Sequence, residues 1–139
     1  MKKTQKLKKL PKKRKELVMS KQSMSQQNEN WLTICATDDL VKDSGICALI
    51  EQGIEEKQVA IFHLPNTEKQ VYAVDNYDPI GEANVLYRGI VGSVGDNIVV
   101  ASPLYKQHFC LTTGKCLQED QSIDVYPARI VNDQVQLLV

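Results

Sequence analysis

The sequence has few of the residues that form metal centres and active sites. Its 139 residues include two histidines and four cysteines, and no two cysteines stand in the Cys-x-x-Cys spacing of zinc or redox-pair sites. No Gly-rich phosphate loop is present, and no apolar run approaches the roughly 20 residues that a transmembrane helix needs. The longest apolar run of the N-terminal segment, residues 17–19, is too short for a secretory signal. We therefore expect a cytoplasmic chain with no independent active site and no membrane contact.

Charge is distributed unevenly along a chain whose formal net charge is zero. Residues 1–24 hold ten Lys or Arg and one acidic residue, a net of +9, whereas residues 25–139 hold seven basic and sixteen acidic residues, a net of −9. Residues 1–30 have almost nothing apolar to bury and are expected to be a disordered basic tail. An alternative is that translation starts at Met24, so that residues 1–23 are not translated. Because no aromatic residue interleaves these charges to stack on bases, we expect no nucleic-acid partner.

Short β-branched runs dominate residues 31–139, and no long stretch has helical periodicity. This pattern predicts an all-β sandwich or barrel. Strands are expected at 31–35, 46–50, 58–64, 70–74, 88–91, 97–101, 107–111, 115–117, 125–131 and 135–139. The predicted connections include a turn or helix start at 37–40 capped by Thr37 or Asp38, a hairpin connection at 92–96 with Gly92 and Gly95 at positive φ, and a turn at Asn132-Asp133.

Two loops, residues 75–81 and 102–106, each follow an apolar run and each contain proline. With the Thr-Thr-Gly turn downstream, this pair resembles the metal-binding half of a Rieske iron–sulfur domain, whose loops carry Cys-x-His and Cys-x-x-His. The four ligand positions of that pattern are occupied here by Asp78, Ile80, Ser102 and Tyr105. The resemblance implies a Rieske-like (ISP-type) antiparallel β-sandwich over residues 31–139, with residues 72–116 as a smaller loop-bearing subdomain.

The residues at these four positions are unsuited to a cluster, which needs two thiolates on one iron and two imidazoles on the other. Ile80 has no lone pair, Tyr105 is a poor substitute for imidazole, and the other two offer only hard oxygen ligands. One carboxylate and one hydroxyl are also too few for calcium. We expect no metal in this chain, and Asp78 and Ser102 are predicted to hydrogen-bond the backbones of their own loops.

The remaining cysteines and histidines give no second site. Cys110 and Cys116 straddle the Thr-Thr-Gly turn, where they either face each other or serve as small apolar strand residues, and we favour the latter. His63 and His108 stand alone and are interpreted as structural or surface residues. No catalytic residue is assigned.

Six stretches carry a closer resemblance, to the small subunits of bacterial NADH-dependent nitrite reductases: residues 45–49, 58–62, 76–79, 85–89, 100–107 and 125–129. The resemblance runs from Trp31 to the C-terminus, and the basic tail is additional. It implies a large subunit as partner, which carries FAD, an iron–sulfur cluster and sirohaem and reduces nitrite to ammonium with NADH, in assimilation or detoxification. This chain would bind none of these cofactors and would support assembly or electron delivery.

The exposed loop tips are the expected docking surface, because binding residues concentrate on loops held by a rigid scaffold. The candidates are Tyr77, Pro79, Leu104, Tyr105 and Lys106. The alternative for Leu104 and Tyr105 is that they fill the space of the absent cluster. Two rival functions are a stand-alone Rieske-like electron-transfer ferredoxin and a non-catalytic binding module that uses the basic tail. The first would need a cluster on the four cysteines, Cys35, Cys47, Cys110 and Cys116.

Overall fold

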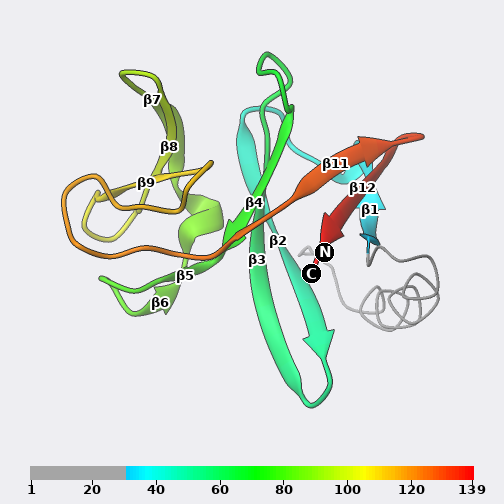
Figure 1. The fold of residues 1–139 in the computed structure, drawn as a ribbon, viewed down its shortest axis with the longest axis horizontal. Helices are drawn as coiled ribbons and strands as arrows, with labels where there is room; N and C mark the ends of the chain where they lie inside the picture. The colour runs from blue at the N-terminus through cyan, green and yellow to red at the C-terminus, as the bar shows by residue number, and fades with distance from the viewer. Residues whose placement is uncertain (1–30) are drawn as a thin grey trace.

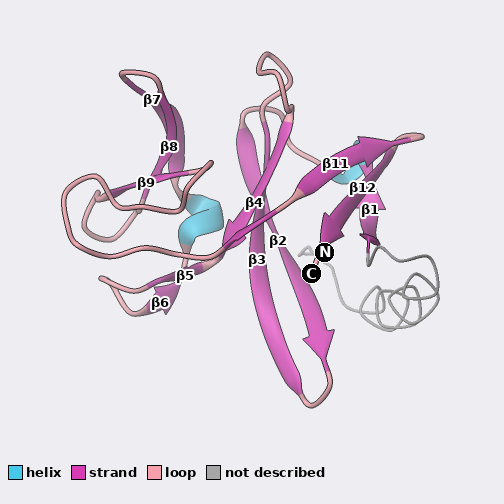
Figure 2. Ribbon diagram, in the orientation of Figure 1, coloured by secondary structure: helices cyan, strands magenta, loops and turns pink. Residues whose placement is uncertain are grey.

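The structure is a computed structural model that describes residues 31–139; the expected basic tail, residues 1–30, lies outside the described residues. The expected all-β architecture is confirmed (Figures 1 and 2). The strands are β1 (Trp31–Ala36), β2 (Ser44–Gln52), β3 (Glu55–His63), β4 (Val71–Asp75), β5 (Tyr77–Asp78), β6 (Ala83–Asn84), β7 (Ile90–Val94), β8 (Asn97–Ala101), β9 (His108–Cys110), β10 (Val125–Tyr126), β11 (Ala128–Val131) and β12 (Gln134–Leu138). Two 3-10 turns, η2 (Thr37–Asp39) and η3 (Leu86–Arg88), complete the elements of this part of the chain.

A four-stranded antiparallel sheet, in the order β10-β4-β3-β2, is the centre of the molecule (Figure 1). The sheet β1-β12-β11 packs on one of its faces. The three-stranded sheet β7-β8-β9, the small β5-β6 pair and η3 form a lobe on its other side (Figure 1). The lobe carries both loops of interest.

Strands β3 and β4 are buried on both faces, which explains why their sequences are apolar without alternation. Val59 and Ile61 of β3 belong to the core between the two larger sheets, here called the first core. Ala60 and Phe62, which alternate with them, belong to the core under the lobe, here called the second core. Successive side chains of a strand point to opposite faces, so one strand contributes to both cores. The lobe is therefore built directly on the central sheet.

The long connection from β9 to β10 crosses the lobe and returns the chain to β4 (Figure 2). It passes Gly114, which has a φ of +81° and whose N–H donates to the Cys110 carbonyl at 2.8 Å. A Cβ at Gly114 would lie 2.0 Å from the carbonyl oxygen of Ile123. Only glycine permits this approach of two backbone segments.

Three details differ from the sequence-based expectations. The hairpin connection is tighter than expected: β7 extends to Val94, and of the two predicted glycines Gly95 has positive φ while Gly92 lies within the strand. The η2 turn begins after Ala36, whose N–H donates to Asp39 Oδ2 at 3.0 Å, so neither predicted cap residue is the cap. Val125 and Tyr126 pair with β4 and not with the final hairpin, since Pro127 separates them from β11.

The final turn was predicted correctly: Asn132 and Asp133, at φ +53° and +63°, join β11 to β12. The predicted smaller subdomain began too early, at residue 72, because β4 belongs to the central sheet. No helix within residues 31–139 has the length and apolar character needed to cross a membrane.

Candidate functional site

The two loops are joined by a buried contact between side-chain oxygens. Ser102 Oγ donates a hydrogen bond to Asp78 Oδ2 at 2.5 Å, and both residues are 0% exposed. Asp78 ends β5 and Ser102 directly follows β8, so the contact links segments 24 residues apart. A buried polar group is tolerated when it is fully hydrogen-bonded. Two of the four predicted positions therefore meet at the base of the loops.

The same two side chains also organise their own loops, as predicted. Asp78 Oδ1 accepts hydrogen bonds from the N–H groups of Ile80 at 2.8 Å and Gly81 at 3.0 Å. Ser102 Oγ accepts one from the Leu104 N–H at 3.2 Å. The predicted Asx- and Ser-type turns are thus confirmed. The contact that joins the two loops was not predicted.

The loops share one local geometry, which the sequence analysis missed. Residues 78–82 read Asp-Pro-Ile-Gly-Glu, and residues 102–106 read Ser-Pro-Leu-Tyr-Lys. In each, the first carbonyl accepts a hydrogen bond from the N–H four residues later, at 2.7 Å from Glu82 and 3.0 Å from Lys106. Both final residues have positive φ. The available signal was a short oxygen-bearing side chain, then proline, then an apolar residue.

The residues present do not fit a [2Fe-2S] cluster. Ser102 Oγ and Asp78 Oδ2 are 2.5 Å apart in a direct hydrogen bond, so there is no room for a metal ion between these two side chains. Ile80 packs against the second core and has no donor atom. Within residues 31–139 no group of three or more His, Cys, Asp or Glu is arranged to hold a metal ion. Hydrogen bonds and apolar packing occupy the place of the cluster ligands.

Apolar contact between the loops lies above the buried pair. A Cβ at Gly81 would lie 2.4 Å from Leu104 Cδ1, so glycine lets the leucine side chain cover the first loop. Leu104 nevertheless remains 44% exposed, and Tyr105 is 64% exposed. The alternative that Tyr105 fills the vacated space is therefore wrong, since Ile80 lies inwards instead. Tyr77 and Lys106 are also exposed and Pro79 is half-buried.

Asn76 anchors the first loop and was not singled out from the sequence. Its side chain is fully buried: Nδ2 donates to Gln58 Oε1 at 3.0 Å and Oδ1 accepts from the Tyr87 N–H at 2.8 Å. Its backbone N–H donates to the Gln58 carbonyl at 3.0 Å, and its carbonyl accepts from the Leu86 N–H at 3.1 Å. The asparagine thereby ties β3 to η3. Its partners are distant in sequence, so no local pattern marked it.

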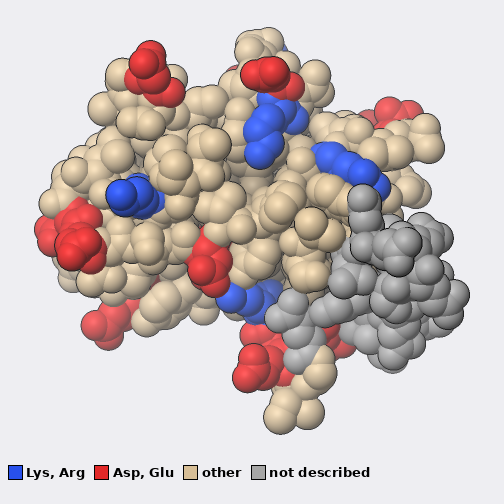
Figure 3. All heavy atoms as spheres, viewed as in Figure 1, with Lys and Arg blue, Asp and Glu red and all other residues tan. Residues whose placement is uncertain are grey.

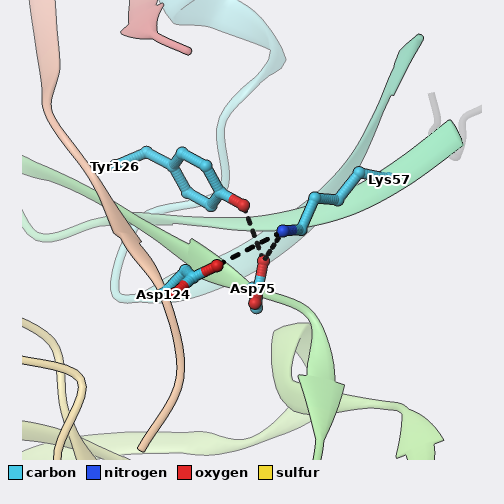
Figure 4. A network of polar contacts seen from close by, with 4 residues as sticks. All are labelled: Lys57, Asp75, Asp124 and Tyr126. Carbon is cyan, nitrogen blue, oxygen red and sulfur yellow. Dashed lines mark hydrogen bonds and ion pairs between the residues drawn. The ribbon is translucent and has the colours of Figure 1, made fainter. Parts of the chain in front are cut away.

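A polar network fixes the base of the same loop (Figure 4). Its members are Lys57, Asp75, Asp124 and Tyr126. Lys57 Nζ lies 3.4 Å from Asp75 Oδ1 and 3.4 Å from Asp124 Oδ2, and the Tyr126 hydroxyl donates to Asp75 Oδ1 at 2.7 Å. Burial raises the pKa of the Tyr126 phenol to about 12, so it stays protonated and keeps donating at neutral pH. Because Asp75 ends β4, the network joins the returning chain to the start of the loop.

A groove of about 230 Å³ adjoins this network. Its lining residues are Leu49, Glu56, Lys57, Gln58, Asp75, Tyr77 and Asn84. The lining contains no cysteine, histidine or serine. Lys57, its one cation, is held by Asp75 and Asp124.

Charged side chains are scattered over the face seen in Figure 3. Lys and Arg groups alternate there with Asp and Glu groups and are separated by uncharged surface. Nucleic-acid-binding domains usually have a basic stripe or patch on one face. The described residues of this face do not form one.

No disulfide joins any two of the four cysteines, and they do not converge on one site. Cys35 is part of the first core, whereas Cys116 packs against the second. Burial raises the pKa of the Cys47 thiol to about 12, which disfavours the thiolate, the form that binds metals. These positions do not support the four-cysteine cluster of the ferredoxin alternative. His108 is paired through Nδ1 with Gln118 Nε2 at 3.1 Å, which agrees with a structural role.

We predict that the purified protein contains no stoichiometric iron or sulfide. Asp78 and Ser102, at two of the four ligand positions, are hydrogen-bonded to each other, and Ile80, at a third, has no donor atom. Iron and acid-labile sulfide should be measured after anaerobic purification and again after incubation with iron and sulfide. A control Rieske ferredoxin treated in parallel should take up both. Two irons per chain with a visible absorption band would contradict the prediction.

Comparison with known proteins gives a consistent assignment. Residues 30–138 match the family described as Rieske-like [2Fe-2S] domain. The chain is 42% identical over 108 residues to the nitrite reductase (NADH) small subunit of Escherichia coli K12, covering 77% of this chain and 95% of that protein. The solution structure of the nitrite reductase [NAD(P)H] small subunit from Erwinia carotovora is 43% identical, with a TM-score of 0.64, over 78% of this chain and 81% of that one.

Two further similarities are informative. A nitrite reductase [NAD(P)H] large subunit from Klebsiella oxytoca is 39% identical over 106 residues, which are 76% of this chain and 10% of that protein. The ferredoxin of carbazole 1,9a-dioxygenase from Nocardioides aromaticivorans has a TM-score of 0.61 at 16% identity, covering 78% of this chain and 96% of that one. At that identity the second similarity concerns the fold alone.

Proposed function

This chain belongs to the Rieske-like [2Fe-2S] domain family and, within it, to the small subunits of NADH-dependent nitrite reductase; from this premise we propose that it binds the large subunit of that enzyme and supports the reduction of nitrite to ammonium. The cofactors of the reaction, FAD, an iron–sulfur cluster and sirohaem, would then reside on the large subunit. The chain itself contributes a protein surface and no redox centre. We place the complex in the cytoplasm, in nitrate or nitrite assimilation or in detoxification.

The observation that carries this proposal is the pattern of matches. The small-subunit relative is covered over 95% of its length, so the likeness extends over nearly that whole protein. A relative named as the large subunit contains a stretch like this chain in one tenth of its length. A domain that occurs separately in one enzyme and within the partner chain in another is expected to work in contact with that partner.

We place the docking surface at the loop tips. Tyr77, Leu104 and Tyr105 are 44%, 44% and 64% exposed, and Lys106 is exposed beside them. Protein interfaces typically have aromatic residues at their centre and polar or charged residues at their rim. The loops are held from below by the Asp78–Ser102 hydrogen bond, so the side chains are presented on a rigid base. Pro79, which is half-buried, would contribute at the edge.

Replacing Tyr105 with alanine is expected to weaken binding to the large subunit by roughly ten-fold or more, because truncated interface aromatics commonly cost about 2 kcal/mol. The melting temperature should change little, since the side chain is 64% exposed. Binding would be measured by co-purification and by titration of the large subunit. Ile54→Ala is the matched control, because Ile54 is a fully exposed apolar residue at the β2–β3 turn. If the Tyr105→Ala variant bound the large subunit normally and only its melting temperature fell, the docking surface would have to lie elsewhere on the chain.

The rival function, a stand-alone electron-transfer ferredoxin, has less support. Its likeness is to the fold of Rieske ferredoxins at 16% identity, whereas the small-subunit relatives are 42% identical. It would also need a cluster, for which this chain lacks fitting ligands. The second rival, a binding module that uses the basic tail, rests on residues 1–30, outside the described residues.

A further inference from the structure

Two charged residues occupy the equivalent last positions of the two loops, in a backbone conformation that suits glycine. Glu82 has a φ of +58° and Lys106 a φ of +67°. Residues with a Cβ rarely adopt these values, whereas glycine adopts them freely. Each N–H closes its loop by donating to the carbonyl four residues earlier, of Asp78 and of Ser102. The turns require this backbone, and a glycine would satisfy it with less strain.

Neither charged side chain contributes a polar contact to the fold. Both residues are exposed, and neither side chain makes a hydrogen bond or an ion pair with residues 31–139. Glu82 and Lys106 contribute to their loops through their backbone N–H groups. The charges of Glu82 and Lys106 are thus available to a second molecule.

The two charges have opposite sign and lie on loops that touch. The loops are linked by the Asp78–Ser102 hydrogen bond and by the packing of Leu104 over Gly81. One of the two linked loops therefore ends in an exposed acidic residue and the other in an exposed basic residue. Charges at the rim of an interface guide encounter and fix its orientation more than they add affinity.

We propose that Glu82 and Lys106 orient the docking of this chain, and that the large-subunit surface carries a basic side chain opposite Glu82 and an acidic side chain opposite Lys106. The inference rests on the proposed function, which supplies the partner, and adds the chemistry of the contact. Two opposite charges at equivalent loop positions favour one docking orientation. If the chain were rotated by 180° on the partner surface, each charge would face a like charge, which is unfavourable.

The test uses the variants Glu82→Gly and Lys106→Gly in the full chain. Each removes a charge and relieves the strained φ, so we expect the melting temperature to stay the same or rise. We expect the Kd for the large subunit to rise about 2- to 5-fold for each, as for the loss of an exposed ion pair. Glu82→Lys and Lys106→Glu should each weaken binding further, by roughly ten-fold. Stopped-flow association over a salt series should show the loss mainly in the association rate.

Asp133→Gly is the matched control, because Asp133 is also acidic, exposed and at positive φ, but lies in the β11–β12 turn. Its melting temperature should change as it does in the variants at 82 and 106, and its Kd for the large subunit should equal that of the wild type. Gly variants at 82 and 106 that bind as tightly as the wild type would overturn the inference, and the docking function would survive if Tyr105→Ala still weakens binding. A wild-type chain that does not bind the large subunit would refute the docking function, and the inference with it.

Discussion

Replacing Asp78 with alanine is expected to destabilise the protein by about 3 kcal/mol, because it leaves the buried Ser102 hydroxyl and the partly buried N–H groups of Ile80 and Gly81 without an acceptor. For a domain of this size the melting temperature would fall by roughly 10 °C or more. Urea unfolding followed by tryptophan fluorescence would measure the free energy of unfolding, since Trp31 is the one tryptophan. The loops should also lose the geometry that presents their tips.

Asp78→Asn separates the effect of hydrogen bonding from that of removing the side chain. The amide keeps an acceptor for the loop N–H groups, and its Nδ2 can donate to Ser102 Oγ. We expect it to lose about 1 kcal/mol, clearly less than the alanine variant. Equal losses for both variants would mean that the carboxyl group itself, and not the set of hydrogen bonds, is required. A loss below about 1 kcal/mol for the alanine variant would contradict the assigned role of the pair.

Gly114→Ala is the second change expected to have a large effect, with a loss of about 3–5 kcal/mol. The added methyl group would lie 2.0 Å from the Ile123 carbonyl oxygen, and alanine would also have to hold a φ of +81°. Because the obstructing atom belongs to the backbone, a rotamer change cannot relieve the clash. The expected readout is a large drop in the urea midpoint, or failure to fold at 37 °C.

Gly53→Ala provides the reference for strain without a clash. Gly53 has a φ of +65°, similar to that of Gly114, but a Cβ there meets nothing within 4 Å. Its loss should be about 1 kcal/mol, the cost of a left-handed backbone for alanine. If the two alanine variants were equally stable, the close approach of the chain at Gly114 would have no energetic consequence.

The strands could be predicted from the sequence because β-branched and apolar runs mark them independently of the rest of the chain. β3 shows the limit of that reasoning. Its run Val59–Phe62 indicated a buried strand, but only the structure shows that alternate residues serve two different cores. The start of the hairpin turn was predicted too early for a related reason. Glycine is common in turns, but Gly92 lies within β7 and the turn is at Gly95. Local sequence patterns therefore predict the presence of a strand more accurately than they predict its last residue.

The candidate site was predictable in its positions and not in its contacts. Asp78 and Ser102 were located by comparison with the cluster pattern, and their local turns follow from residue type. Their mutual hydrogen bond depends on how β5 and β8 are brought together across 24 residues, which no local pattern encodes. Asn76 was missed for the same reason, since its partners on β3 and η3 become neighbours only in the folded chain.

The hydrogen bond between Asp78 and Ser102 also affects how the subunit is produced. In a domain whose loops are closed by an iron–sulfur cluster, that closure has to wait until iron and sulfide have been delivered. Here the closure is made by two side chains of the chain itself. The link between the two loops therefore forms as the chain folds, from groups of the chain alone.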